Sequence, residues 1–475
     1  MTKRWLYLVL TCVFLLSGSQ ASAAFSPAMD EFNSAYQKGE SLSLDVKAQL
    51  KSWKALSKDS LPAVSELLQD ANMHLDFSKQ SENLRLDHLG KTIFSLQQFK
   101  NQEKSGLYLP LSGLGFESVS GADPVDLLPG KSEAVNLLLS ALQIDLHSFA
   151  DLPQTAVLLM APYGEMQQRR TDIKLVGTSK NLMQYKLTAD QWQILWPYVL
   201  EKLNSLLPAE LPQVRDALEL LRFEKPVTVK RYLDDAGAAM GWGVNANVLF
   251  SQGDERKLSL TLGHRAEEAF SLTLKAPAAR GKNNLQLDLS YAIETKGPNA
   301  LLRYETRLGS QNYLLKGEAA FKNDLTESTE HLRGTLWMEE KQGSEKASRL
   351  TLKPDLHLSG GRAEGTLQAL HERGGKPELD VNFSLALFKG GLIEMVRPDK
   401  IYFLDTEPEL AKAAISGVML PLLRDILFLV PLPQRKLLLH DMGRTLRTQG
   451  ELLPAIIERM PDYLVIEDTM KEVFP

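Results

Sequence analysis

Residues that could form a hydrolase or nucleotide site occur in this sequence only as fragments of the corresponding motifs. The string Gly177–Asn181 lacks the last glycine of a G-x-S-x-G nucleophile elbow and falls where a hairpin turn is expected. Gly113 and Gly115 begin like a dinucleotide fingerprint, but Ser118 takes the place of the third glycine and no βαβ unit surrounds them. No P-loop is present in the sequence. The first fragment predicts a turn, the second is an incomplete fingerprint, and neither predicts an active site.

Metal-ligating and acid–base residues are present but dispersed. The histidines have neither H-x-H nor H-E-x-x-H spacing; they are His74, His88, His147, His264, His331, His357, His371 and His440. A zinc site needs three or four converging ligands, so we expect no metal and no cofactor, although ligands distant in sequence can meet in space. We interpret Asp234-Asp235 and His371-Glu372 as turns and Arg169-Arg170 as a short basic pair. The sequence thus predicts a protein that is not an enzyme.

The N-terminal segment has the three regions of a signal peptide. Lys3 and Arg4 are basic, Leu6–Leu16 is almost entirely apolar, and Ala21–Ala23 offers the small side chains that signal peptidase accepts. The apolar run is shorter than the ~20 residues that a membrane-spanning helix needs. We therefore predict cleavage after Ala23 and export to the periplasm or the extracellular space.

Charge and cysteine content exclude further classes. The formal net charge of −5 has the wrong sign for a protein that binds the phosphate backbone, so no nucleic-acid partner is expected. The one cysteine, Cys12, lies in the predicted signal peptide, which leaves the mature chain without a thiol for catalysis or for a disulfide. A second apolar stretch, 413–430, contains Arg424 and Asp425, each costing about 2.5–3.5 kcal/mol at a bilayer centre. We interpret it as a packed or amphipathic helix, so no transmembrane helix is expected in the mature chain.

Alternation of apolar and polar residues dominates the mature sequence. The period of two that begins at Leu42 is typical of a half-buried β-strand. From Pro226 to Phe388 short alternating segments follow one another, with turn residues between them and polar residues at the opposite positions. One wet and one apolar face per strand indicates an antiparallel sheet that is solvated on one side.

The pattern divides the chain into five parts. Residues 1–23 are the signal peptide, 24–112 a strand–helix–meander unit, and 113–153 a connecting loop and helix. Residues 154–396 are a second strand–helix unit with a long antiparallel meander, and 397–475 a helical segment packed on the sheet. We therefore predict an α+β fold of antiparallel β-meander half-barrel units with helices on the concave face. The order strand, helix and meander occurs in both units as a pattern and not as a repeat of the same residues, so whether the units are true duplicates is left open.

An apolar face as long as this one must be covered. Either the protein's own helices cover it completely, or sheet and helices leave an apolar cavity between them. The helix after the capping box Thr188–Gln191 carries Trp192 and Trp196. With Trp242, these are the side chains that we select as candidate cavity walls; the alternative is that all three are ordinary core residues.

At the level of pattern the chain resembles the periplasmic lipoprotein-carrier family and its mycobacterial lipid-binding relatives. The resemblance is carried by the signal segment to Ala23, the strand and helix of Leu42–Leu68, and the meander of Leu258–Leu387. It implies an exported half-barrel with a helical lid over an apolar cavity that binds a lipid, an acyl chain or a lipoprotein; it transfers no individual ligand residue. Two alternatives stay open: an interaction or structural module of the cell envelope with a fully packed core, and an enzyme whose site assembles only in space.

Overall fold

A computed structural model describes residues 26–54, 61–119, 164–206, 218–249, 255–265, 269–276, 285–308 and 313–414, without residues 102, 220, 327–328, 392 and 412, and the isolated positions 417 and 429. The predicted signal peptide lies outside these ranges. So do most of the predicted connecting segment 113–153 and most of the predicted C-terminal helical segment 397–475, including almost all of the apolar stretch 413–430.

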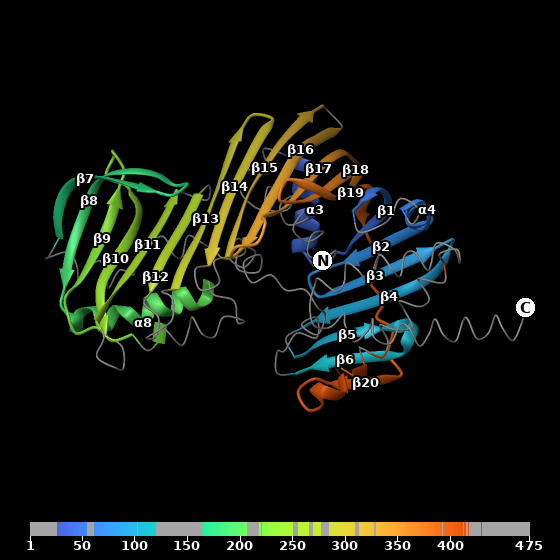
Figure 1. The fold of residues 1–475 in the computed structure, drawn as a ribbon, viewed down its shortest axis with the longest axis horizontal. Helices are drawn as coiled ribbons and strands as arrows, with labels where there is room; N and C mark the ends of the chain where they lie inside the picture. The colour runs from blue at the N-terminus through green and yellow to red at the C-terminus, as the bar shows by residue number, and fades with distance from the viewer. Residues whose placement is uncertain are drawn as a thin grey trace, which may run out of the picture.

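The described residues are mostly β-strand (Figure 1). The α-helices are α3 (Pro27–Gln37), α4 (Leu61–Gln69) and α8 (Ala189–Leu206). The strands are β1 (Leu42–Trp53), β2 (Ala71–Phe77), β3 (Ser81–His88), β4 (Lys91–Lys100), β5 (Ser105–Leu109), β6 (Leu114–Ser118), β7 (Gly164–Ile173), β8 (Gly177–Leu187), β9 (Val227–Leu233), β10 (Ala239–Leu249), β11 (Glu255–Arg265), β12 (Ala269–Ala276), β13 (Leu285–Lys296), β14 (Asn299–Leu308), β15 (Tyr313–Leu325), β16 (Glu330–Gln342), β17 (Ser348–Ser359), β18 (Arg362–Arg373), β19 (Lys376–Lys389) and β20 (Lys400–Phe403). Among these residues no helix combines the length and the apolar character that crossing a bilayer requires.

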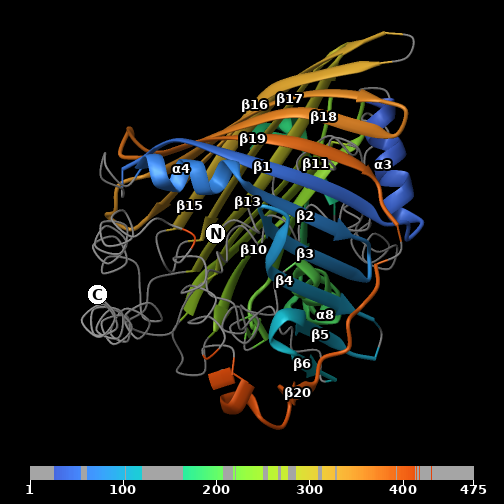
Figure 2. The same ribbon diagram turned by 90° about the vertical axis from the view of Figure 1, so that its right-hand side faces the viewer.

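All the strands belong to one continuous sheet. Strands β7 to β19 follow one another as the first antiparallel meander. Strands β1 to β6 form a second antiparallel meander, and its first strand, β1, pairs with β19 and so joins the two meanders. The last strand, β20, adds to β6 in parallel. Figure 2 shows β1 lying between β19 and β2, so the beginning of the described chain is inserted between its two meanders.

The predicted fold class is therefore wrong. The alternating segments are strands as expected, but they do not form two half-barrel units of an α+β protein; they form one twenty-stranded sheet with few helices among the described residues. The physical reason is that alternation specifies a strand and its two faces, whereas it does not specify which strand lies beside it. Strand β1 takes its partner β19 from the far end of the described chain.

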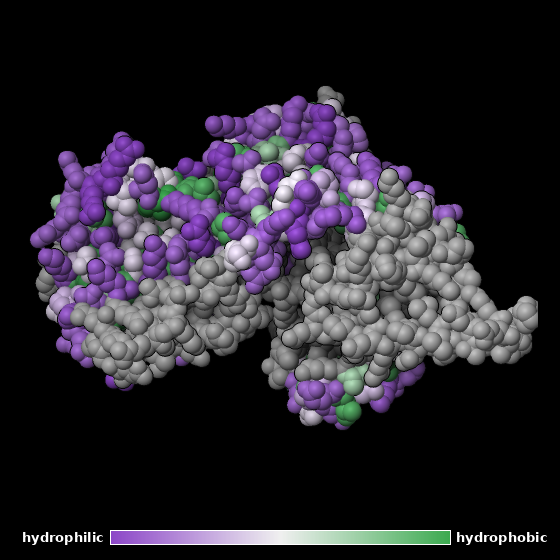
Figure 3. Space-filling view, in the orientation of Figure 1, coloured by the Kyte–Doolittle hydropathy of each residue, from purple (hydrophilic) through white to green (hydrophobic). Residues whose placement is uncertain are grey.

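One face of the sheet is apolar from β8 to β19 and on through β1 to β2, and we call it the apolar face. Strands β4 to β6 contribute to a separate apolar cluster. Its buried side chains come from alternate positions of consecutive strands and form one connected cluster with α3 and α8. Examples from β11 to β16 are Leu258, Leu260, Leu262, Phe270, Leu272, Leu274, Leu287, Leu289, Tyr291, Leu302, Tyr304, Leu315, Ala319, Phe321, Leu332, Leu336 and Met338. The residues between them carry ion pairs, such as Arg303 with Glu318 at 3.0 Å. Hydrophilic side chains predominate over β14 to β18 at the top of Figure 3.

Side-chain hydrogen bonds at their N-termini fix where α8 and α3 begin. Thr188 and Gln191 form the predicted capping box, with Gln191 N donating to Thr188 Oγ1 at 3.2 Å and Thr188 N to Gln191 Oε1 at 2.9 Å. The N-terminus of α3 is held by Glu330 of β16, which accepts from Ala28 N and from Ser26 Oγ, both at 2.6 Å. A buried carboxylate at this position also interacts favourably with the helix dipole.

The pairing of β1 with β19 can be tested by a disulfide, because the predicted mature chain has no cysteine of its own. Lys47 and Ser384 are exposed register partners, so Lys47→Cys with Ser384→Cys, in a Cys12→Ser background, is expected to cross-link on mild oxidation. Their Cα atoms should lie within the ~7 Å that a disulfide tolerates. The measurement is the mobility of the oxidised chain on a non-reducing gel.

The matched control moves the second cysteine from Ser384 to Thr366. Thr366 is the register partner of Ser384 on β18 and is exposed on the same face. Lys47→Cys with Thr366→Cys spans two strand spacings, roughly 10 Å, and should not cross-link. Equal cross-linking of both pairs, or none in the first, would mean that β1 does not lie beside β19.

Candidate functional site

The three tryptophans selected from the sequence all lie on the apolar face. Trp192 and Trp196 project from α8, and Trp242 comes from β10; their exposed fractions are 1%, 7% and 6%. Phe223 lies edge-on to both α8 indoles, with ring centroids 5.9 Å from Trp192 and 5.1 Å from Trp196. The sheet and α8 therefore bring the three residues into one apolar cluster. Their role as walls of a ligand site stays a prediction.

Two polar atoms within this cluster have no partner among the described residues. The indole Nε1 atoms of Trp192 and Trp196 are buried and donate no hydrogen bond there. A buried donor without an acceptor costs about 1–3 kcal/mol, and native proteins rarely leave one unsatisfied. The two N–H groups are therefore available to an acceptor that the described residues do not supply.

The described helices cover only part of the apolar face. Twenty strands at about 4.8 Å spacing make a sheet on the order of 95 Å wide. Helices α3, α4 and α8 contain 11, 9 and 18 residues, which at 1.5 Å per residue amounts to roughly 57 Å of helix about 10 Å thick. In Figure 1, α8 crosses strands of the first meander towards one end of the sheet, and α3 lies near β17 and β1, in the middle of the strand order. The apolar side chains of β13 to β15 are nevertheless buried, with Leu289 at 1% and Leu315 at 0% exposed.

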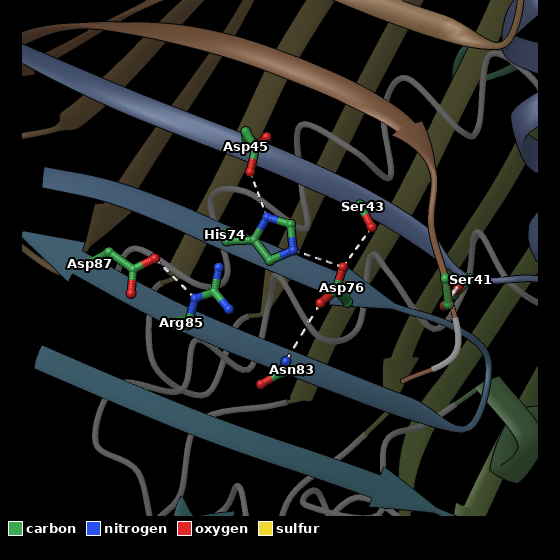
Figure 4. A network of polar contacts seen from close by, with 9 residues as sticks. Ser41, Ser43, Asp45, His74, Asp76, Asn83, Arg85 and Asp87 are labelled. Atoms are coloured by element: carbon green, nitrogen blue, oxygen red, sulfur yellow. Dashed lines mark hydrogen bonds and ion pairs between the residues drawn. The ribbon is translucent and has the colours of Figure 1, made fainter. Parts of the chain in front are cut away.

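The polar face carries a separate network around His74, shown in Figure 4. His74 of β2 lies between two carboxylates: its Nδ1 is 2.5 Å from Asp45 Oδ1 on β1, and its Nε2 is 3.0 Å from Asp76 Oδ1. Ser43 Oγ donates to Asp76 Oδ1 at 2.5 Å, and Asn83 Nδ2 to Asp76 Oδ2 at 3.5 Å. Strand register places these residues together, because Ser43 is the partner of Asp76 and Asp45 the partner of His74.

The electrostatics of this network favour a doubly protonated imidazole. The hydrogen bond to Asp76 is the largest cause that raises the pKa of His74 to about 9; burial opposes it, and the bond to Asp45 adds to it. Burial by itself would raise the pKa of Asp76, but the hydrogen bonds from His74 and Ser43 outweigh it and lower that pKa. Because the serine donates to the aspartate and both ring nitrogens face carboxylates, His74 cannot accept a proton from Ser43. The network is an ion-pair link between β1 and β2 and not a nucleophile with its base.

The other residues considered from the sequence are found in turns and strands. Gly177–Asn181 lies at the start of β8, after a hairpin turn, and the Ser179 hydroxyl is buried beside the carbonyl oxygens of Asn181 and Leu233. Asp234 closes a turn by accepting from Ala238 N at 2.7 Å, with Gly237 at φ 82°. Gly113 has φ 66° and ends a 3-10 turn before β6. The interpretation as a turn is confirmed at Asp234-Asp235. It is wrong at His371-Glu372, which lie in β18, before the turn at Gly374-Gly375.

Sequence reasoning missed two clusters on the polar face: the His74 network and a group formed by His331, Asp355 and His357. The signal that could have found them is the alternation itself, since His74 and Asp76, like Asp355 and His357, are two positions apart and therefore share a face. Their partners on neighbouring strands follow only from the register.

Replacing His74 by glutamine should remove a pH-dependent part of the stability. The pKa of His74 is higher in the folded than in the unfolded chain, so protonated His74 stabilises the fold. This contribution is complete below the unfolded-state pKa near 6.5 and is lost as the pH rises through about 9. The melting temperature of His74→Gln should therefore lie furthest below wild type near pH 6 and approach it near pH 9.5. We expect a difference on the order of 1–2 kcal/mol at the lower pH, since the partner Asp45 is partly exposed and screened.

The control is His88→Gln, a histidine of β3 outside this network, whose melting temperature should follow that of wild type across the range. A constant offset of His74→Gln at every pH would contradict the ion-pair link.

Comparison with known proteins assigns the chain to no family: no family model and no curated protein matches it. Among solved structures, a loop-deletion mutant of OmpT, an outer membrane protein of Vibrio cholerae, is 9% identical and aligns with 74% of this chain and 97% of its own, at a TM-score of 0.19. Wzi of Escherichia coli, an outer membrane protein described as a carbohydrate-binding β-barrel, is 8% identical over 78% of this chain and 89% of its own, with a TM-score of 0.28. OccK11 of Pseudomonas aeruginosa is 8% identical over 75% and 97%, with a TM-score of 0.19. No conclusion about fold or function rests on these likenesses.

Proposed function

We propose that this protein is an exported protein of the cell envelope that binds an acyl-chain ligand against the apolar face of its sheet. The ligand class comprises lipids, free acyl chains and the acylated tail of a lipoprotein. The observation that carries the proposal is the apolar face itself, one connected cluster of apolar side chains contributed by consecutive strands.

The composition of the apolar face suits an alkyl chain. The side chains at its centre, on β13 to β15, are Leu, Ala and aromatic residues, which offer dispersion contacts and few directed polar groups. Burying alkyl groups gains roughly 0.8 kcal/mol per methylene, so a chain of about twelve methylenes would gain ~10 kcal/mol before the cost of association. Such a face provides affinity for an alkyl chain without requiring a specific polar contact.

The buried indoles supply the polar contact that an amphiphile needs. An ester or carboxylate oxygen near α8 would accept from Nε1 of Trp192 or Trp196, the two donors left without a partner among the described residues. Satisfying them recovers the 1–3 kcal/mol that each unpaired buried donor costs. This supports an orientation with the head group at α8 and the alkyl chain extending over β13 to β15.

Photo-crosslinking from within the sheet tests the proposal. Phe321 of β15 is 4% exposed and belongs to the apolar face, and p-benzoylphenylalanine keeps its phenyl ring and adds a photoreactive benzoyl group that extends into that face. Irradiation of cells that produce this variant, followed by intact-mass analysis of the purified chain, is expected to give an adduct whose mass increase corresponds to an acyl-bearing molecule.

The matched control places the same photoreactive residue at the adjacent position Lys322, which is exposed on the polar face. This variant should give no such adduct, because neighbouring residues of a strand point to opposite faces. A variant at Phe321 that yields only crosslinks within the chain would contradict the proposal and favour a fully packed core. Equal lipid adducts at both positions would mean nonspecific membrane contact and would also contradict it.

A further inference from the structure

Two histidines and one aspartate from two neighbouring strands of the meander lie together on the polar face. His331 of β16 is the register partner of His357 on β17, and their imidazole rings stack with centroids 4.0 Å apart and an interplanar angle of 16°. Asp355 precedes His357 by two positions, so it shares the same face of β17. The three side chains form a triangle across two neighbouring strands.

The candidate ligand atoms are close enough to converge on one ion. One atom from each of the three residues lies within 4.8 Å of the other two, and His331 Nε2 is 2.6 Å from Asp355 Oδ1. Two ligands at about 2.0–2.1 Å from a tetrahedral zinc are roughly 3.3 Å apart. Side-chain rotations that separate His331 from Asp355 by less than an ångström would therefore admit an ion between them. All three side chains are partly or fully accessible, so an ion can reach them from solvent.

The surroundings leave these three groups available for coordination. The neighbouring carboxylate Asp324, the register partner of His331 on β15, is engaged by Lys322 at 2.7 Å and Arg333 at 2.6 Å. Glu364, the register partner of His357 on β18, forms an ion pair with Arg362. Of the three carboxylates Asp324, Asp355 and Glu364, Asp355 is thus the one that bonds to an imidazole and not to a lysine or an arginine.

We propose that His331, His357 and Asp355 form a binding site for a divalent transition-metal ion, Zn²⁺ being the most suitable. Two imidazoles and one carboxylate are ligands that Zn²⁺ and Cu²⁺ prefer over Mg²⁺ and Ca²⁺. Three protein ligands leave one tetrahedral position for water or an external group. The site lies on the polar face, away from the acyl-chain ligand of the proposed function, and does not depend on it.

Zinc titration of the tag-free full chain tests the site. Isothermal titration calorimetry with Zn²⁺ at pH 7.5 is expected to show one ion per chain, and His331→Ala and His357→Ala should each weaken binding about tenfold or more. Asp355→Asn should weaken it as well. The control His88→Ala removes a histidine outside the cluster and should leave the affinity unchanged.

The Cu²⁺ form gives a second, independent measurement. Its electron paramagnetic resonance spectrum should show coupling to two imidazole nitrogens in the wild-type chain and to one in either histidine variant. Circular dichroism of each variant verifies that the sheet is retained. Binding of Zn²⁺ that is equally strong in both histidine variants, or no stoichiometric binding by the wild-type chain, would overturn the proposal.

Discussion

The pairing of β1 with β19 is the interaction on which the rest of the structure depends. It joins residues 42–53 to residues 379–389 through eleven register pairs, and on its other side β1 pairs with β2. Closing a chain segment of this length costs on the order of 5 kcal/mol in loop entropy. The ladder has to offset that cost, because without it each meander would end in an unpaired edge and the apolar face would be divided in two.

Polar contacts reinforce the position of β1 from both ends. Before the strand, α3 is held to β16 by Glu330, and Glu31 of α3 pairs with Lys389 of β19 at 2.7 Å. Within the strand, Asp45 pairs with His74 of β2. These contacts lie at or near the junction of the two meanders, so they stabilise a long-range pairing that local sequence does not specify. The apolar face gains its continuity from the same junction.

The sequence predicted local structure well and long-range structure poorly, for a physical reason. Alternation identified the strand-rich region from Pro226 to Phe388, and the capping box identified the start of α8, because each depends only on neighbouring residues. The partner of β1 and the convergence of His331 with His357 depend on register between strands, which no local pattern encodes. The α+β half-barrel prediction failed at this point, since two similar meanders were taken as separate units. The three tryptophans lie on the apolar face because a helix and a strand both present them inward, and their role as cavity walls stays a prediction.

The central claim is that a continuous apolar face binds an acyl-bearing molecule. Native mass spectrometry of the protein purified from its own envelope, without detergent exchange that would replace a bound lipid, tests this claim most directly. The account predicts a species whose mass exceeds that of the bare chain by one or more acyl-bearing molecules, released intact on collisional activation. A spectrum that contains only the bare chain, from protein whose sheet is intact by circular dichroism, would contradict it.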